Sequence, residues 1–241
     1  MLHQVRGIVL HHLRYSDTSV IAKIYTNKFG LQSYLVKGVG SSKAKIKLAM
    51  FECLNLLEMV VYYRERKNLQ TIRELHPAHF FTTLHTDIRK STLALFINEV
   101  ISKSIKEEES NPALFDFLFQ MVLDLDDPDF FTPDFHLRFM LKFSKFLGFE
   151  PRKNYTHNSW FNLHEGIFED RRSDSGEYIA PEFTGYLNDL LCMDNLCEPS
   201  FSIPPSARAM LLNRLIHYYR LHLPEFGELK TPEVLHEILS A

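Results

Sequence analysis

The sequence predicts an α+β protein in which an antiparallel barrel of five strands precedes an α-helical domain. Three observations lead to this prediction. Short apolar segments separated by turn residues fill roughly the first 80 residues, and from Thr86 onward the apolar residues recur at helical spacing. The charge also changes along the chain, because residues 1–80 hold 12 Lys and Arg against 5 Asp and Glu, whereas residues 81–241 hold 15 against 25. We therefore expect one domain at residues 1–80 and a second at residues 81–241.

Five segments of the first domain have the composition of strands, with β-branched and aromatic residues between Gly, Asn, Asp and Ser. They are expected at residues 5–15, 20–25, 31–36, 51–63 and 69–74. A tight turn is expected at Phe29-Gly30. Five short antiparallel strands without a long helix among them are typical of an OB-fold barrel, since a sandwich generally needs about seven strands.

Helical periodicity governs the second domain. Asn111-Pro112 and Thr132-Pro133-Asp134 are typical helix starts, and Gly148 is a typical helix end. Three helices are expected up to Leu147, and three more at residues 183–193, 205–223 and 231–239. A polar stretch near residues 150–182, with prolines, glycines and the only tryptophan, predicts a small hairpin insertion between them.

The composition is typical of a globular protein in a reducing compartment. Hydrophobic residues make up 45% of the 241 residues, which is enough for a sizeable core. The three cysteines, Cys53, Cys192 and Cys197, are scattered and odd in number, which argues against a disulfide framework. No signal peptide is evident, and no run approaches the ~20 apolar residues of a membrane span. We expect a cytoplasmic protein without membrane contact.

Motifs for catalysis or cofactor binding are missing. Glycines are too sparse for a P-loop or a dinucleotide fingerprint, and no G-x-S-x-G elbow or C-x-x-C pair occurs. His76 and His79 lack a credible further ligand, and the acidic run at residues 124–129 lacks the glycine and terminal glutamate of a calcium loop. We therefore predict no catalytic residue, no metal, no cofactor and no enzymatic activity.

Much of the basic excess of the first domain lies in two connections between expected strands, a Gly- and Ser-rich loop and a turn. The cations are Lys37, Lys43, Lys45 and Lys47 in the loop, and Arg64, Arg66 and Lys67 in the turn. Such a surface suits a polyanion, and phosphate contacts alone give binding that is nearly independent of sequence. Since the long loop can fold back, both connections can open on the same end of the barrel, with the lysine loop as the stronger DNA-binding candidate.

Four tyrosines on expected strands are candidates for stacking on bases. They are Tyr15, Tyr34, Tyr62 and Tyr63. Aromatic residues on strands more often belong to the core, so both interpretations stay open.

Three cations share one face of the expected helix that ends at Leu147. Arg138, Lys142 and Lys145 are spaced at i, i+4 and i+7 beside a series of phenylalanines. Such a stripe is either an ordinary solvent-facing surface or a cationic groove suited to an acidic, hydrophobic peptide.

Four runs of the first domain carry a resemblance to a known family. They are Gly7-Ile8-Val9-Leu10, Tyr15-Ser16-Asp17-Thr18, Tyr25-Thr26-Asn27-Lys28-Phe29-Gly30 and Val36-Lys37-Gly38. Together they resemble the bacterial recombination mediator RecO, and the helical remainder is similar in pattern. The resemblance implies an N-terminal OB-fold and a C-terminal helical domain.

The resemblance also implies a function in DNA repair and recombination. RecO proteins bind single- and double-stranded DNA, anneal complementary strands and contact RecR. They also bind the acidic C-terminal tail of single-stranded DNA-binding protein (SSB), and so help to load RecA on coated strands. On this basis Arg138, Lys142 and Lys145 are expected to receive the SSB tail.

One departure from the family is visible. Many members hold zinc through four cysteines in the helical domain, whereas residues 154–181 contain no cysteine. Trp160, Phe161 and Phe168 are expected to supply a small apolar core in place of the metal. Two other functions stay open: an OB-fold RNA-binding or ribosome-associated adaptor, and a zinc-free remnant of a nuclease or other hydrolase.

Overall fold

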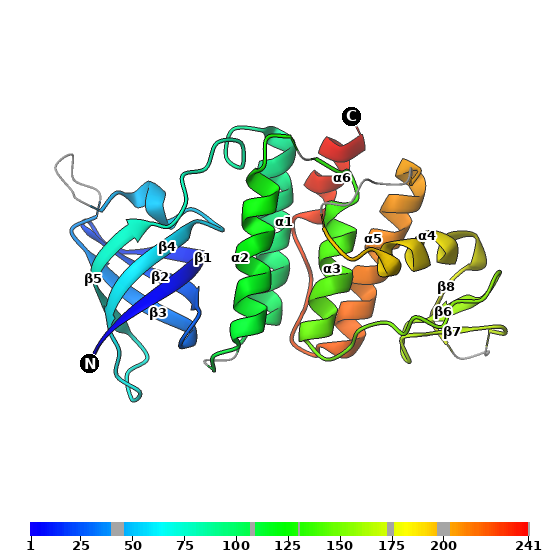
Figure 1. Ribbon diagram of the computed structural model, residues 1–241, viewed down its shortest axis with the longest axis horizontal. Coiled ribbons are helices and arrows are strands. Elements are labelled where there is room, and N and C mark those ends of the chain that lie inside the picture. The colour runs from blue at the N-terminus through cyan, green and yellow to red at the C-terminus, as the bar shows by residue number, and fades with distance from the viewer. Residues whose placement is uncertain (40–45, 107–108, 130, 173–175, 197–202, 241) are drawn as a thin grey trace. The chain divides into compact units, whose positions relative to one another are not determined.

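Five strands close into a barrel in the N-terminal part of the chain, and helices follow (Figure 1). The computed structural model describes residues 1–39, 46–106, 109–129, 131–172, 176–196 and 203–240. The strands are β1 (Leu2–Ser16), β2 (Ser19–Thr26), β3 (Gly30–Lys37), β4 (Leu56–Tyr62) and β5 (Gln70–Pro77). Their order around the barrel is β1-β2-β3-β5-β4, which confirms the predicted five-stranded barrel followed by helices.

Two details of the predicted barrel differ from the structure. β3 and β5 run parallel, with Tyr34 opposite Gln70, whereas the other strand pairs are antiparallel. The reason is topological, because an odd number of strands cannot alternate in direction all the way round a closed barrel. The fourth strand begins at Leu56 rather than at Phe51, since η1 (Leu48–Phe51) is a 3₁₀-helix that places Phe51 in the barrel core.

Alternate residues of the strands point inward and form the barrel core, as the two-residue period of a strand requires. On β2 and β3 the buried apolar members are Val20, Ala22, Ile24, Tyr34 and Val36. The turn expected at Phe29-Gly30 is present between these strands. Gly30 has a φ of 57°, a left-handed conformation that glycine adopts without steric cost, and the Thr26 hydroxyl donates to its carbonyl at 3.0 Å.

Two helices, α1 (Ile88–Ser104) and α2 (Pro112–Asp126), belong to the same compact unit as the barrel, residues 1–127. The Asn98 side chain on α1 donates to the carbonyl of Leu10 at 2.9 Å. Arg6 on β1 pairs with Asp116 on α2 at 3.1 Å, and its guanidinium lies 5.0 Å from the centre of the Phe119 ring. These contacts explain why the compact unit extends beyond the boundary expected at residue 80.

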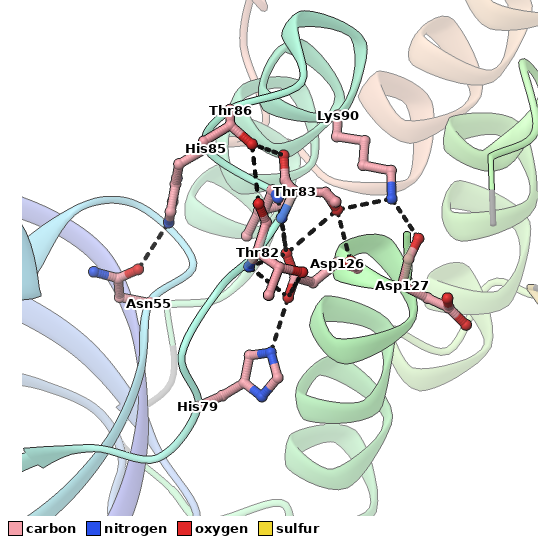
Figure 2. A network of polar contacts seen from close by, with 10 residues as sticks. Asn55, His79, Thr82, Thr83, His85, Thr86, Lys90, Asp126 and Asp127 are labelled. Atoms are coloured by element: carbon pink, nitrogen blue, oxygen red, sulfur yellow. Dashed lines mark hydrogen bonds and ion pairs between the residues drawn. The ribbon is translucent and has the colours of Figure 1, made fainter. Parts of the chain in front are cut away.

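A buried carboxylate joins the segment after the barrel to the end of α2 (Figure 2). Asp126 is 4% exposed and accepts hydrogen bonds of 2.8 to 3.1 Å from the backbone N–H groups of residues 82–84. The ring of His79 lies 2.9 Å from the same carboxylate. Lys90 of α1 is buried nearby and donates to the backbone carbonyl of Asp127. The connector between barrel and helices is therefore fixed by buried polar contacts.

The second compact unit, residues 128–241, is mainly helical. Its helices are α3 (Phe135–Phe146), α4 (Pro181–Cys192), α5 (Pro205–His222) and α6 (Pro232–Ser240). The stretch expected as a hairpin insertion forms a small sheet of order β7-β6-β8, made of β6 (Trp160–Asn162), β7 (Ile167–Glu169) and β8 (Tyr178–Ile179). In the described part of the chain, no helix combines the length and the apolarity needed to cross a membrane.

Candidate nucleic-acid interface

The lysines of the predicted loop flank a segment that precedes β4. Lys37 is the exposed last residue of β3, and Lys47 is the exposed residue that precedes the 3₁₀-helix η1. Lys43 and Lys45 lie outside the described residues. No carboxylate of the described chain forms an ion pair with Lys37 or Lys47, so both ammonium groups are available to a polyanion.

The predicted turn connects β4 to β5, and a buried glutamine holds it. Arg64, Arg66 and Lys67 are all exposed. The Gln70 side chain is 2% exposed and accepts a hydrogen bond from the Arg64 backbone N–H at 3.0 Å. Its amide donates to the carbonyls of Arg64 at 2.9 Å and of Lys67 at 2.6 Å. Such multiple pairing fixes the backbone from which the cations project.

The described cations of the two groups, Lys47 and Arg64, are connected to opposite ends of β4, while the expected shared end depends on the fold of residues 40–45, which lie outside the described chain. Lys47 precedes β4 and Arg64 follows it, and a strand leaves the barrel at the end opposite to the one it enters. At about 3.3 Å per residue, the two ends of the seven-residue strand β4 lie roughly 20 Å apart. A nucleic acid has to cross the barrel surface to touch both.

A ring stack connects the β2–β3 turn to the end of β4. The ring of Phe29 stacks on the ring of Tyr63, with centroids 3.8 Å apart and planes at 7°. This stacking brings the β2–β3 turn beside the β4–β5 connection, whereas the exposed Lys28 lines a hollow with Arg6 and Glu58. Neither Lys28 nor Gln70 was among the site residues predicted from the sequence. A polar residue at an inward position directly after a basic turn was the available signal for Gln70.

The four candidate tyrosines divide into two classes. Tyr34 is fully buried in the barrel core, and Tyr63 is occupied by its stack on Phe29. Tyr15 and Tyr62 are 65% and 44% exposed. Tyr15 and Tyr62 are therefore the exposed members of the four.

The barrel face between β1, β4 and β5 carries both signs of charge. Cross-strand register places Arg6 opposite Glu58 and Glu58 opposite His76, while Val60 lies opposite Glu74. These residues line a hollow of about 450 Å³. Glu58 and Glu74 repel phosphates whereas Lys28 in the same lining attracts them, so this hollow offers a nucleic-acid backbone no continuous positive path.

The expected cationic stripe on α3 is not a continuous surface. Arg138 is fully buried and pairs with Asp134 at 2.8 Å, and it also donates to the carbonyl of Leu196 at 3.0 Å. Lys142 is half-buried and donates to the carbonyl of Met193 at 2.6 Å. Lys145 alone of the three is exposed. Burial of Arg138 overturns the prediction that it lies on a solvent-facing stripe, because α3 is buried around most of its circumference.

The described residues of the insertion, 150–172 and 176–182, do not fit a zinc ion. Phe161 and Phe168 are buried with ring centroids 5.0 Å apart, and Phe168 also packs against the ring of Tyr155. Asn162 closes the β6–β7 turn by accepting from the backbone N–H of His164 at 2.9 Å. Within the described residues, no three His, Cys, Asp or Glu side chains gather as a metal site would require. Aromatic side chains therefore form the small apolar core against which this sheet packs.

Comparison with known proteins decides the family. The model of the recombination protein O N-terminal region matches residues 1–81, and the model of its C-terminal region matches residues 85–232. The chain belongs to the recombination protein O family. It is 36% identical to DNA repair protein RecO of Phocaeicola vulgatus over 241 residues, covering 100% of both chains. It is 37% identical to DNA repair protein RecO of Bacteroides fragilis and 33% identical to that of Flavobacterium psychrophilum, each over 98% or more of both chains.

The two recombination protein O regions meet in the connector held by Asp126. The N-terminal match ends at residue 81 and the C-terminal match begins at residue 85, between His79 and the start of α1. In this member of the family the compact units instead divide after Asp127. The first two helices of the C-terminal region thus share a unit with the barrel.

Proposed function

We propose that this chain is a non-enzymatic, DNA-binding mediator of recombinational DNA repair. The relatives that it matches over nearly their whole length are named DNA repair proteins. The observation that carries the DNA-binding part is the arrangement of the barrel cations. Lys37 and Lys47 at one end, and Arg64, Arg66 and Lys67 at the other, are exposed and form no ion pair with a carboxylate of the described residues.

The two basic ends suit binding to both single- and double-stranded DNA. Each lysine or arginine that contacts a phosphate releases counterions, which favours binding whatever the base sequence. Two complementary strands repel one another through their phosphates, and a protein that neutralises both lowers this repulsion. Annealing of strands follows from the same charges, without a catalytic residue.

The partners in this proposal are RecR, SSB and, through them, RecA. An acidic SSB tail needs an accessible cation to bind. The docking surface proposed on α3 therefore consists of Lys145 and the half-buried Lys142, and it excludes the buried Arg138. Pull-down with SSB, and with SSB lacking its last residues, tests this part. Equal capture of both SSB forms would show that the tail is not the element bound.

Fluorescence anisotropy with labelled oligonucleotides tests the main proposal. We expect binding to single strands and to duplex that weakens steeply as salt rises and varies little with sequence. Competition with structured RNA separates the remaining alternative, an RNA-binding or ribosome-associated adaptor. If structured RNA displaces labelled single-stranded DNA at a far lower concentration than unlabelled DNA does, the result contradicts the DNA-repair function and supports the RNA-binding adaptor.

The absence of catalysis has its own test. Labelled DNA incubated with the protein and a divalent metal should remain intact. A DNA-cleaving activity that co-purifies with the protein would contradict the mediator function and favour a hydrolase.

A further inference from the structure

A pocket of about 240 Å³ lies beside the β4–β5 turn. Its lining consists of Tyr62, Arg64, Lys67, Leu69, Gln70 and Thr71. Sites for drug-sized ligands are usually about 300–1,000 Å³, so this pocket is too small for such a ligand. One flat ring system is a better match for its size.

The wall of the pocket offers an aromatic surface at the end of a rigid strand. Tyr62 is the last residue of β4 and is paired with Leu2 on one side and Thr71 on the other. Its neighbour Tyr63 stacks on Phe29, which anchors the chain immediately after Tyr62. Since successive side chains of a strand point to opposite faces, this anchoring leaves the Tyr62 ring on the outer face.

Positive charge flanks that aromatic surface. Arg64 and Lys67 both line the pocket and are exposed, and the buried Gln70 side chain holds their backbone carbonyls. Glu65 is the one acidic residue between them in sequence, so the four residues 64–67 keep an excess of positive charge. Because the backbone of this site is already fixed, little of the binding free energy is lost to ordering the turn when a ligand binds.

We propose that this pocket receives one unpaired base of single-stranded DNA, stacked on Tyr62, with the neighbouring phosphates held by Arg64 and Lys67. The proposal rests on the DNA-binding function proposed above. It adds a subsite that accepts a base only when that base is unpaired. Base–aromatic stacking tolerates any base, because every base has a π-face. A base in a duplex is already stacked between its neighbours, and taking it out requires unpairing. The pocket therefore favours single strands over duplex.

Three DNA probes separate stacking from charge: an oligo-dT strand, an abasic strand of the same length and phosphate number, and a duplex. Replacing Tyr62 by Ala should weaken binding of oligo-dT by about fivefold to a hundredfold in an anisotropy titration. Binding of the abasic strand and of the duplex should be unchanged. The Tyr62→Phe variant keeps the ring face and should bind oligo-dT as the wild-type protein does.

A matched control is Phe80→Ala, which removes a 79% exposed aromatic side chain outside the barrel strands of the same unit. It should leave all three affinities unchanged. Equal thermal midpoints for wild type, Tyr62→Ala and Tyr62→Phe establish that the variants are folded. A folded Tyr62→Ala protein that binds oligo-dT like wild type overturns the subsite, and so does an equal loss on the abasic strand. Failure of the wild-type protein to bind any of the three probes would instead overturn the proposed function itself.

Discussion

The carboxylate of Asp126 lies 2.9 Å from Nε2 of His79, although the two residues are 47 positions apart in the sequence. Burial alone would raise the pKa of Asp126. The hydrogen bond from His79 and those from the backbone N–H groups of residues 82–84 outweigh burial and lower the pKa to about 2. Asp126 is therefore ionised at neutral pH and only accepts hydrogen bonds, which makes His79 the donor.

Replacing Asp126 by Asn should destabilise the first compact unit at neutral pH. An aspartate with a lowered folded-state pKa stabilises the fold above its unfolded-state pKa of about 3.8, and this stabilisation disappears as the pH falls toward 2. The difference between wild type and variant should be about 2 kcal/mol at pH 7 and should shrink between roughly pH 4 and pH 2. Urea unfolding at a series of pH values measures it.

Asp124→Asn is the control for this experiment. Asp124 lies on the same helix, and its side chain accepts a hydrogen bond from Gln120 at 2.8 Å. The cluster of backbone donors that surrounds Asp126 does not reach the Asp124 side chain. Its replacement should change the free energy of unfolding little. A difference between wild type and Asp126→Asn that stays constant from pH 7 to pH 2 would contradict the role assigned to the ionised carboxylate.

Replacing Arg138 by Ala should destabilise the second compact unit rather than abolish a docking surface. The Asp134–Arg138 pair is buried on both sides, and removing one member of such a pair costs about 3–5 kcal/mol because the other charge remains without compensation. Lys145→Ala removes an exposed cation of the same helix and should change stability by less than about 0.5 kcal/mol. Thermal unfolding that ranks the two variants in the reverse order would contradict this assignment.

The barrel could be predicted from the sequence because its strands are short, β-branched and bounded by turn residues such as Phe29-Gly30. Two features of the site could not be predicted. Arg138 and Lys145 fall on the same face of the helix by their spacing. The sequence does not show that Asp134 and the carbonyl of Leu196 surround Arg138 and leave Lys145 exposed. The separation of Lys47 from Arg64 depends on how a strand enters and leaves a closed barrel, which is a property of the three-dimensional arrangement.

Removal of divalent metal should leave the helical unit folded. The interior of the β6–β7–β8 sheet is filled by Phe161 and Phe168, and residues 154–181 offer no thiolate. The thermal midpoint should therefore be the same before and after dialysis against a chelator. Elemental analysis of protein purified without a histidine tag provides the second measurement. About one zinc per chain, lost together with the folded state, would contradict this prediction.

Charge removal in the lysine loop and in the β4–β5 turn should change the salt dependence of DNA binding additively. Removing one cation that neutralises a phosphate lowers the slope of log K against log salt by about 0.7 on single strands. Replacing Lys43, Lys45 and Lys47 by Ala should reduce the slope by about two units, and replacing Arg64 and Lys67 by Ala by about 1.4 units. Since the two ends of β4 are roughly 20 Å apart and the two groups share no described contact, the combined variant should show the sum of both reductions.

The affinity should fall uniformly across sequences in all three variants, and strand annealing should fall with it, because phosphates carry no sequence information. Lys145→Ala on the helical unit is the matched control and should keep the wild-type slope. If the folded triple-lysine variant keeps both its affinity and its slope while the Arg64 and Lys67 variant loses them, DNA binds only at the β4–β5 end. If neither variant changes the slope, the DNA lies on another surface of the chain and the interface assigned to the barrel is wrong.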